Sequence, residues 1–116
     1  MSEVALNLVV IRSSDLAKSE RFYKALGLHF KLERHGNGPE HYVTEIGSTV
    51  FEIYPRKRGD ELTGTTRLGF RVPSVDVALA ELNDVGATVI SHPTTSAWGR
   101  RAVVSDPDGH RVEISE

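Results

Sequence analysis

The sequence runs through the same succession of predicted elements twice, and this repeat limits the fold more than any single segment does. Arg12 to Gly27 and Arg71 to Gly86 each hold a strand end, a helix-capping residue, a helix and a closing glycine. A shift of 59 residues superimposes these two segments, so that strand, cap, helix length and glycine all agree. We interpret the agreement as a duplicated structural unit rather than as coincidence.

Each half shows the pattern strand, helix, strand and hairpin. In the first half we expect strands at Val4–Arg12, Leu28–Arg34, His41–Ile46 and Thr49–Tyr54, and a helix at Leu16–Leu26 that Gly27 ends. The first of these strands is so uniformly apolar that we expect it to be covered on both faces.

The second half repeats this order of elements and has its own helix-capping and turn residues. We expect strands at 65–72, 87–90, 101–105 and 110–115, a helix begun by Pro73-Ser74 and closed by Gly86, and a loop at 93–97. Asp106-Pro107-Asp108-Gly109 has the residues of a tight turn between the last two strands. The doubled βαβββ order predicts an α+β fold in one domain, residues 1–116, with modules at about 4–55 and 65–115 joined by a charged linker at 56–64.

Composition excludes several classes of partner. The net charge of −2 gives no electrostatic reason to expect binding to nucleic acid or to a membrane surface. The chain has no cysteine, and its start lacks the basic and apolar segments of a signal peptide. We therefore expect a cytoplasmic protein whose partner is a small molecule.

The repeat also pairs positions that could form a site. The 59-residue shift places Leu8 on Arg67, and the two hairpins place Glu52 opposite Glu113. If the two halves form one curved sheet, these four side chains can converge on its concave face. Glu52 has apolar and aromatic same-face neighbours, whereas Glu113 considered alone resembles a surface residue.

The motifs resemble those of the vicinal oxygen chelate superfamily, which includes glyoxalase I, bleomycin-resistance and fosfomycin-resistance proteins and extradiol dioxygenases. The resemblance covers nearly the whole chain, and its strongest part is the combination of Phe22-Tyr23 before Leu26-Gly27 with Asp106-Pro107-Asp108-Gly109 before Val112-Glu113-Ile114. It implies two βαβββ modules that form an incompletely closed barrel around a cleft. It also implies a homodimer and, in many members, a divalent metal.

This chain departs from the metal-binding members of the family. Glu52 and Glu113 occupy the hairpin positions that supply carboxylate ligands, but the first-strand positions hold Leu8 and Arg67. Leucine has no ligand atom and arginine repels a cation, so we expect no zinc site at these positions. Magnesium or manganese held by two carboxylates and water stays open as an alternative.

Two functional hypotheses follow from this departure. The preferred one is a metal-independent small-molecule-binding protein of the sequestration type, with Leu8, Glu52, Arg67, Trp98 and Glu113 as ligand-binding residues. The alternative is a glyoxalase-like lyase or isomerase, or a dioxygenase-type enzyme, with Glu52 or Glu113 as a catalytic base and a weakly held divalent metal.

Several side chains allow two interpretations. Arg67 either neutralises Glu52 and Glu113 or anchors an anionic group of a ligand. Trp98 either caps the cleft or fastens its loop to the core. The histidines are interpreted as ordinary surface residues, with His41 and His110 retained as candidates for ligand binding.

Overall fold

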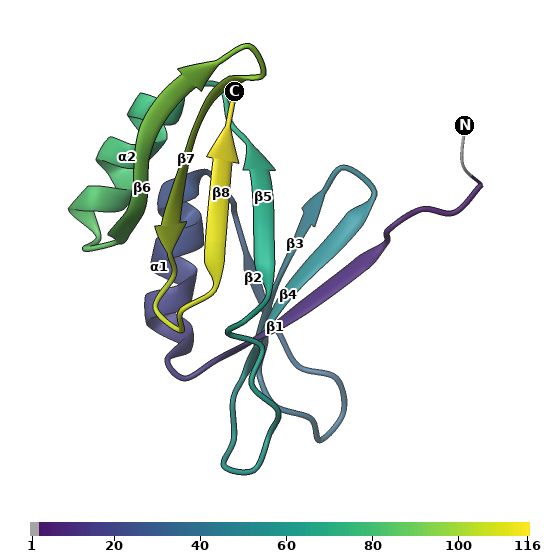
Figure 1. Cartoon of the computed structure of the whole chain (residues 1–116). Helices are drawn as coiled ribbons and strands as arrows, with labels where there is room; N and C mark the ends of the chain where they lie inside the picture. The colour runs from purple at the N-terminus through teal and green to yellow at the C-terminus, as the bar shows by residue number, and fades with distance from the viewer. Residues whose placement is uncertain (1–2) are drawn as a thin grey trace.

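The computed structural model describes residues 3–116 as an α+β fold of two four-stranded mixed sheets and two helices, without a closed barrel among these residues (Figure 1). The first module contains β1 (Leu8–Ser13), α1 (Leu16–Leu26), β2 (Lys31–Glu33), β3 (His41–Ile46) and β4 (Thr49–Pro55). The second contains β5 (Arg67–Arg71), α2 (Val75–Asp84), β6 (Thr88–Ser96), β7 (Gly99–Ser105) and β8 (Arg111–Ser115). The βαβββ order predicted for each half is confirmed.

Local capping signals determine where both helices begin and end. The Asp15 side chain accepts a hydrogen bond from the Lys18 N–H at 3.1 Å, and Gly27 ends α1 with a φ of 121°. At α2, the Ser74 hydroxyl oxygen accepts a hydrogen bond from the Val77 N–H at 3.2 Å. These bonds satisfy amide groups that have no partner within the helix, which is why the predicted helix starts are confirmed.

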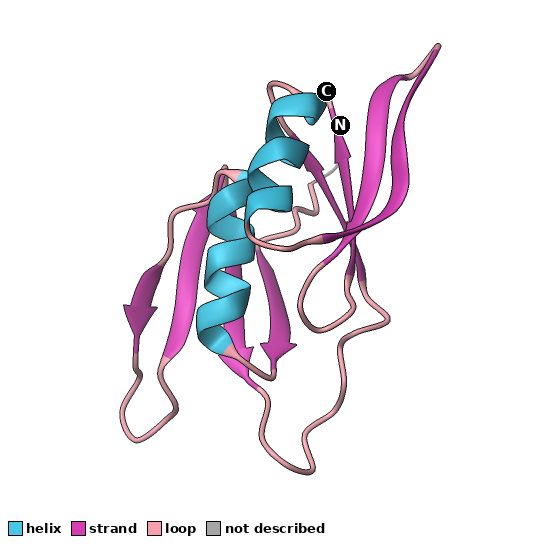
Figure 2. Cartoon of the chain, turned by 90° about the vertical axis from the view of Figure 1, so that its left-hand side faces the viewer, coloured by secondary structure: helices cyan, strands magenta, loops and turns pink. Residues whose placement is uncertain are grey.

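The two sheets have the same topology. Their strand orders are β1-β4-β3-β2 and β5-β8-β7-β6, so each module places its first strand at an edge and parallel to its last strand. Helix α1 packs on β3 and β4, α2 packs on β6 and β7, and the two helices contact each other. In Figure 2 the two helices lie next to each other in the centre of the view, with strands visible on either side.

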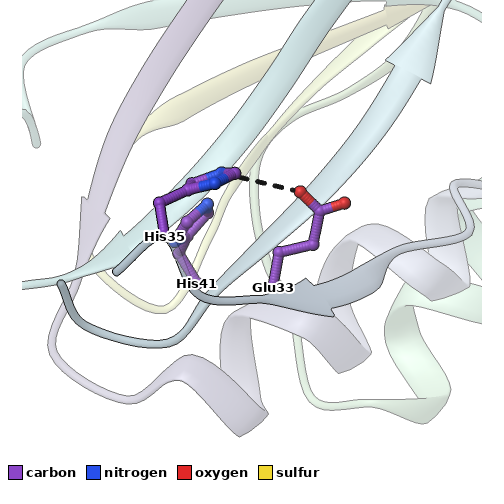
Figure 3. A group of neighbouring side chains, drawn as sticks. All are labelled: Glu33, His35 and His41. Atoms are coloured by element: carbon purple, nitrogen blue, oxygen red, sulfur yellow. Dashed lines mark ion pairs between the residues drawn. The ribbon is translucent and has the colours of Figure 1, made fainter. Parts of the chain in front are cut away.

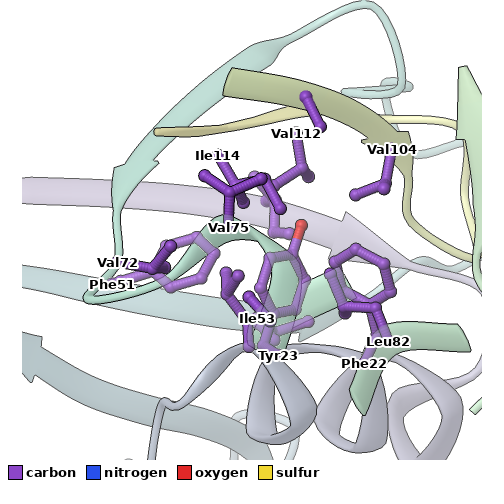
Figure 4. Close-up of a cluster of buried hydrophobic side chains, with 14 residues drawn as sticks. Phe22, Tyr23, Phe51, Ile53, Val72, Val75, Leu82, Val104, Val112 and Ile114 are labelled. Atoms are coloured by element: carbon purple, nitrogen blue, oxygen red, sulfur yellow. The ribbon is translucent and has the colours of Figure 1, made fainter. Parts of the chain in front are cut away.

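The core lies where the helices meet the sheets, and it is shared by both modules (Figure 4). Tyr23 stands edge-on to Phe22 and Phe51, with ring centroids 4.8 and 5.3 Å away, and Phe51 lies 6.0 Å from Phe70 of the second module. Each such side chain contributes about 1.5–3 kcal/mol through burial. The modules are therefore held together by apolar contact between their inner faces.

The first strand is shorter and more exposed than its sequence predicted. It begins at Leu8 rather than Val4, and Leu8 and Val10 are 49% and 36% exposed while Ile11 is buried. The prediction of cover on both faces is wrong, because α1 covers only the inner face of this sheet. The outer face of β1 is left apolar and open.

The second strand of the second module is longer than predicted. β6 runs through the segment expected to be a loop, Pro93 included, with register shifts at Val89/Ser91 and Ser91/Thr94. A proline is accommodated here because β6 is an edge strand and its pairing is irregular. In the first module, β2 keeps only three residues of the predicted strand. No helix within residues 3–116 is both long and apolar enough to cross a bilayer.

Candidate ligand-binding site

Glu113 lies on the outer face of the second sheet, between two arginines. Its Oε1 atom is 3.3 Å from Arg67 Nη2 on β5 and 3.2 Å from Arg101 Nη1 on β7. Gly69, directly opposite on β5, leaves space above the carboxylate. The two ion pairs hold the Glu113 carboxylate in place on this face.

Glu52 lies on the outer face of the first sheet and has a different partner. Its register partner on β1 is Val10, and its Oε2 atom is 3.6 Å from His41 Nε2 on β3. His41 in turn stacks on Tyr54, with ring centroids 4.1 Å apart and an interplanar angle of 8°. Glu52 is therefore enclosed by an imidazole and apolar side chains rather than by arginine.

The structure divides the predicted site residues between the two sheets. Leu8 pairs with Val50 and so shares the outer face of Glu52, whereas Arg67 contacts Glu113. Within residues 3–116, neither Arg67 nor Glu113 forms an ion pair with Glu52, so the arginine neutralises one of the two carboxylates. The convergence of Leu8, Glu52, Arg67 and Glu113 on one site stays a prediction, which the structure of a single chain does not test.

Trp98 lies in the turn between β6 and β7. Its side chain is 94% exposed, and its backbone N–H donates to Ser96 Oγ at 3.1 Å. It does not fasten its loop to the core, so that interpretation is wrong. The exposed Trp98 side chain could instead be covered by a bound ligand or by a second protein molecule.

An apolar cleft opens between the two sheets near β1 and β5. It has a volume of about 330 Å³, and Arg67 is the predicted site residue that lines it. The other lining residues come mostly from the edge and inner face of each sheet: Leu6, Val9, Ile46, Thr49, Phe51, Leu68, Gly69 and Phe70. An apolar wall with one cationic group at the edge is typical of a site for a small molecule that carries an anionic group.

The donor set does not fit the divalent metal found in many members of the resembled family. On the outer face of the first strands, Leu8 and Val10 offer no ligand atom in β1, and Arg67 and Gly69 offer none in β5. The Glu113 carboxylate is already held by two arginines. We therefore assign no metal-dependent step to these positions.

The interpretation of the histidines as surface residues is wrong for two of them. His41 and His110 are 1% and 0% exposed, and both are held by hydrogen bonds. His110 Nδ1 lies 2.8 Å from Asp106 Oδ2, and His110 Nε2 lies 2.7 Å from the Thr63 hydroxyl oxygen. Thr63 also accepts a hydrogen bond from the Arg12 N–H at 2.9 Å, which ties the segment between the modules to β1.

Asp106 is the centre of this buried network. The Tyr23 hydroxyl donates to its Oδ2 atom at 2.7 Å, and the His110 and Asp108 amides donate to its Oδ1 atom at 3.0 and 2.9 Å. Burial alone would raise the pKa of Asp106, but the hydrogen bonds from His110 and Tyr23 hold it below its usual value. Burial and the adjacent Asp106 carboxylate raise the pKa of the Tyr23 hydroxyl, which keeps it a donor.

The same turn touches the first module at a second point. Asp108 Oδ1 accepts a hydrogen bond from the Ser14 N–H at 2.8 Å, just before α1. The Asp106–Gly109 turn therefore joins the two modules, in addition to reversing the chain. Its sequence predicted the turn but not this role, since the partners in α1 and in the segment before β5 are far away in sequence.

Known proteins with similar sequence or structure support one family. Residues 5–114 match the Glyoxalase/Bleomycin resistance protein/Dioxygenase superfamily. An uncharacterized protein of Mycolicibacterium smegmatis is 30% identical over 110 residues, which cover 95% of this chain and 91% of that protein.

Two solved structures from a Streptomyces species share the fold. TnmS3, described as an antibiotic-binding protein, is 25% identical with a TM-score of 0.77, covering 99% of this chain and 97% of its own. A glyoxalase/bleomycin resistance protein is also 25% identical, with a TM-score of 0.75 and coverage of 97% and 100%. The doubled βαβββ architecture and the match over 5–114 establish that the chain belongs to the glyoxalase/bleomycin resistance/dioxygenase superfamily.

Proposed function

We propose that this protein binds a small molecule with an apolar or aromatic body and an anionic group, and sequesters it without chemical change. The observation that carries the proposal is the apolar cleft between the sheets, with Arg67 at its edge. The 25% identity to an antibiotic-binding protein over almost the whole chain supports the same class of function. We place this activity in the cytoplasm.

The site is proposed to be completed in a homodimer. One edge of the first sheet carries three exposed apolar side chains. They belong to Leu6, Leu8 and Val10, which are 68%, 49% and 36% exposed. Edge strands with exposed apolar side chains are open to pairing or packing with another chain. A second copy that covers this face would bring a second set of predicted site residues, Glu113 and Trp98 included, toward Glu52.

Metal independence belongs to the same proposal. The positions that supply ligands in metal-binding relatives hold Leu8 and Arg67 here, and Arg67 is engaged with Glu113. A guanidinium group at this place recognises an anion through directed hydrogen bonds, and it opposes a cation. The ligand therefore makes direct contact with protein side chains.

Calorimetric titration with a panel of aromatic antibiotics, some acidic, some neutral and some cationic, tests the proposal. We expect acidic members to bind stoichiometrically, with equal affinity in the presence and absence of EDTA, and to be recovered unchanged by mass spectrometry. Arg67→Ala should weaken binding about tenfold or more, as expected for loss of a charged hydrogen bond.

Arg71→Ala is the matched control, because Arg71 lies on the same strand and shares the outer face but does not contact Glu113. Equal losses in the two variants would contradict a directed role for Arg67. Recovery of a converted product would replace sequestration by catalysis.

An enzyme is the second candidate, and the pair formed by Glu52 and His41 favours it. A carboxylate 3.6 Å from a buried imidazole nitrogen is an arrangement that can move a proton in a lyase or isomerase. Glu113 is the weaker candidate base because its carboxylate is already engaged by two arginines. Turnover that disappears in Glu52→Gln, with ligand affinity retained, would support this alternative.

A further inference from the structure

A second cluster of side chains lies at the β2–β3 hairpin. It contains Glu33, His35 and His41, whose potential ligand atoms all lie within 4.8 Å of one another. His35 Nε2 is 3.7 Å from Glu33 Oε1, and the two imidazole rings are 5.1 Å apart at an angle of 35°. Figure 3 shows the His35 ring directed toward Glu33, with His41 beneath it.

His41 provides the independent observation that this cluster lacks a partner. Its Nδ1 atom lies 3.1 Å from the Pro39 carbonyl oxygen, which can only accept, so Nδ1 carries the proton. The Nε2 atom then presents its lone pair, and it is the buried side-chain nitrogen without a hydrogen-bond partner within residues 3–116. An unpaired buried acceptor is costly unless something binds to it.

A histidine whose Nδ1–H donates to a backbone carbonyl, with Nε2 unpaired, has the geometry of a metal ligand. Metal-binding histidines usually donate their second ring N–H to a carbonyl or carboxylate, which orients the ring and increases its basicity. Pro39 supplies that carbonyl to His41. The tight stack of His41 on Tyr54 holds the ring in place from its other side.

The charge around the cluster favours a cation. Glu33 contributes one carboxylate, and Glu52 Oε2 lies 3.6 Å from the unpaired His41 Nε2. The Arg12 guanidinium lies over the Tyr54 ring, 5.2 Å from its centroid. Arg34, also nearby in sequence, is directed to Glu40 at 3.7 Å.

We propose that Glu33, His35 and His41 bind a divalent transition-metal ion of the zinc class, with Glu52 or water as the fourth ligand. Two imidazoles select zinc, nickel or copper over magnesium or calcium. Tetrahedral zinc places its ligand atoms about 3.3 Å apart, so the cluster contracts slightly on binding. His35 is the ligand that moves, since it is exposed and is followed by Gly36 and Gly38.

Glu33, His35 and His41 lie outside the positions that bind metal in the resembled family, because they come from the β2–β3 hairpin; Glu52, the possible fourth ligand, is the one position in common. Its consequence is local: a bound ion ties the 34–40 loop to the outer face of the first sheet. The inference does not depend on the proposed ligand-binding function, which is tested in the presence of EDTA.

Calorimetric titration of tag-free, EDTA-treated protein with zinc chloride near neutral pH tests the proposal, with magnesium chloride as comparator. We expect one zinc ion per chain and no saturable magnesium binding. His35→Ala and Glu33→Gln should each weaken zinc binding about tenfold or more, because each removes one ligand. His92→Ala is the matched control, an exposed histidine on β6 outside the cluster.

A measurement on His41 itself avoids replacing a buried residue. In nitrogen NMR spectra, the His41 Nε2 resonance should shift when zinc is added, while that of His92 stays in place. Absence of saturable zinc binding would overturn the proposal. Equal losses in His35→Ala and His92→Ala, or zinc binding that leaves the His41 resonance unchanged, would do the same by showing adventitious surface coordination.

Discussion

Replacing Tyr23 by phenylalanine removes one hydroxyl from the fully buried joint between the modules. That hydroxyl donates to Asp106 Oδ2 at 2.7 Å, and its loss leaves the carboxylate with donors from His110 and from the Asp108 amide. A hydrogen bond to a charged group contributes about 1.5–3 kcal/mol, so we expect the free energy of unfolding to fall by about 2 kcal/mol. For a chain of this length, the melting temperature should fall by roughly 6–10 °C.

The effect of Tyr23→Phe should depend on pH in a defined direction. The folded pKa of Asp106 is below its ordinary value of 3.8, so the network stabilises the fold above that pH and loses this contribution as pH falls through the folded pKa. Below that range the carboxyl group is protonated, and the hydroxyl no longer donates to an anion. The difference in unfolding free energy between wild type and Tyr23→Phe should therefore shrink in acid.

Urea denaturation at fixed protein concentration, at neutral pH and in an acid series, measures both quantities. Tyr42→Phe is the control, because Tyr42 is half-buried and its hydroxyl has no hydrogen bond among residues 3–116; its effect should stay within about 0.5 kcal/mol. A loss below about 0.5 kcal/mol in Tyr23→Phe, or a loss that grows in acid, would refute the reasoning.

Three further changes test other parts of the structure. Val10→Asp places a charge on the exposed outer face of β1, and light scattering after gel filtration should then report a monomer instead of the proposed dimer; a dimer would contradict that interface. Gly109→Ala forces a side chain into a φ of 91° in the joining turn, so urea unfolding should show a loss of about 1–2 kcal/mol, and an unchanged midpoint would argue against strain there. Ser74→Ala removes the cap of α2 and should cost about 1 kcal/mol by the same assay, whereas Ser74→Asp, which keeps an acceptor, should cost much less.

The parts of the fold that the sequence predicted well depend on neighbouring residues. The bounds of α1 were predicted correctly because Asp15 and Gly27 act on amides and carbonyls within a few residues of themselves. The bounds of β3, His41–Ile46, were also predicted correctly. The family was identified because these local signals occur twice in the same order.

The parts that were predicted poorly depend on what lies across space. The apolar run at the start of the chain gave no sign that only one of its faces would be covered. His110 looked like a turn residue, since its partner Thr63 is distant in sequence, as is Tyr23, which shares the Asp106 carboxylate with it. A carboxylate at position 106 followed by a histidine four residues later was the available signal, but nothing in the sequence placed Tyr23 against it.

The joint between the modules has a consequence for how such a protein can change during evolution. Within residues 3–116, none of the hydrogen bonds that connect Asp106, His110, Tyr23 and Thr63 involves the segments 35–40 or 91–97. Substitutions in those two segments can therefore accumulate without loosening the contact between the halves. A protein built in this way can acquire a new ligand preference during evolution while keeping its folding stability.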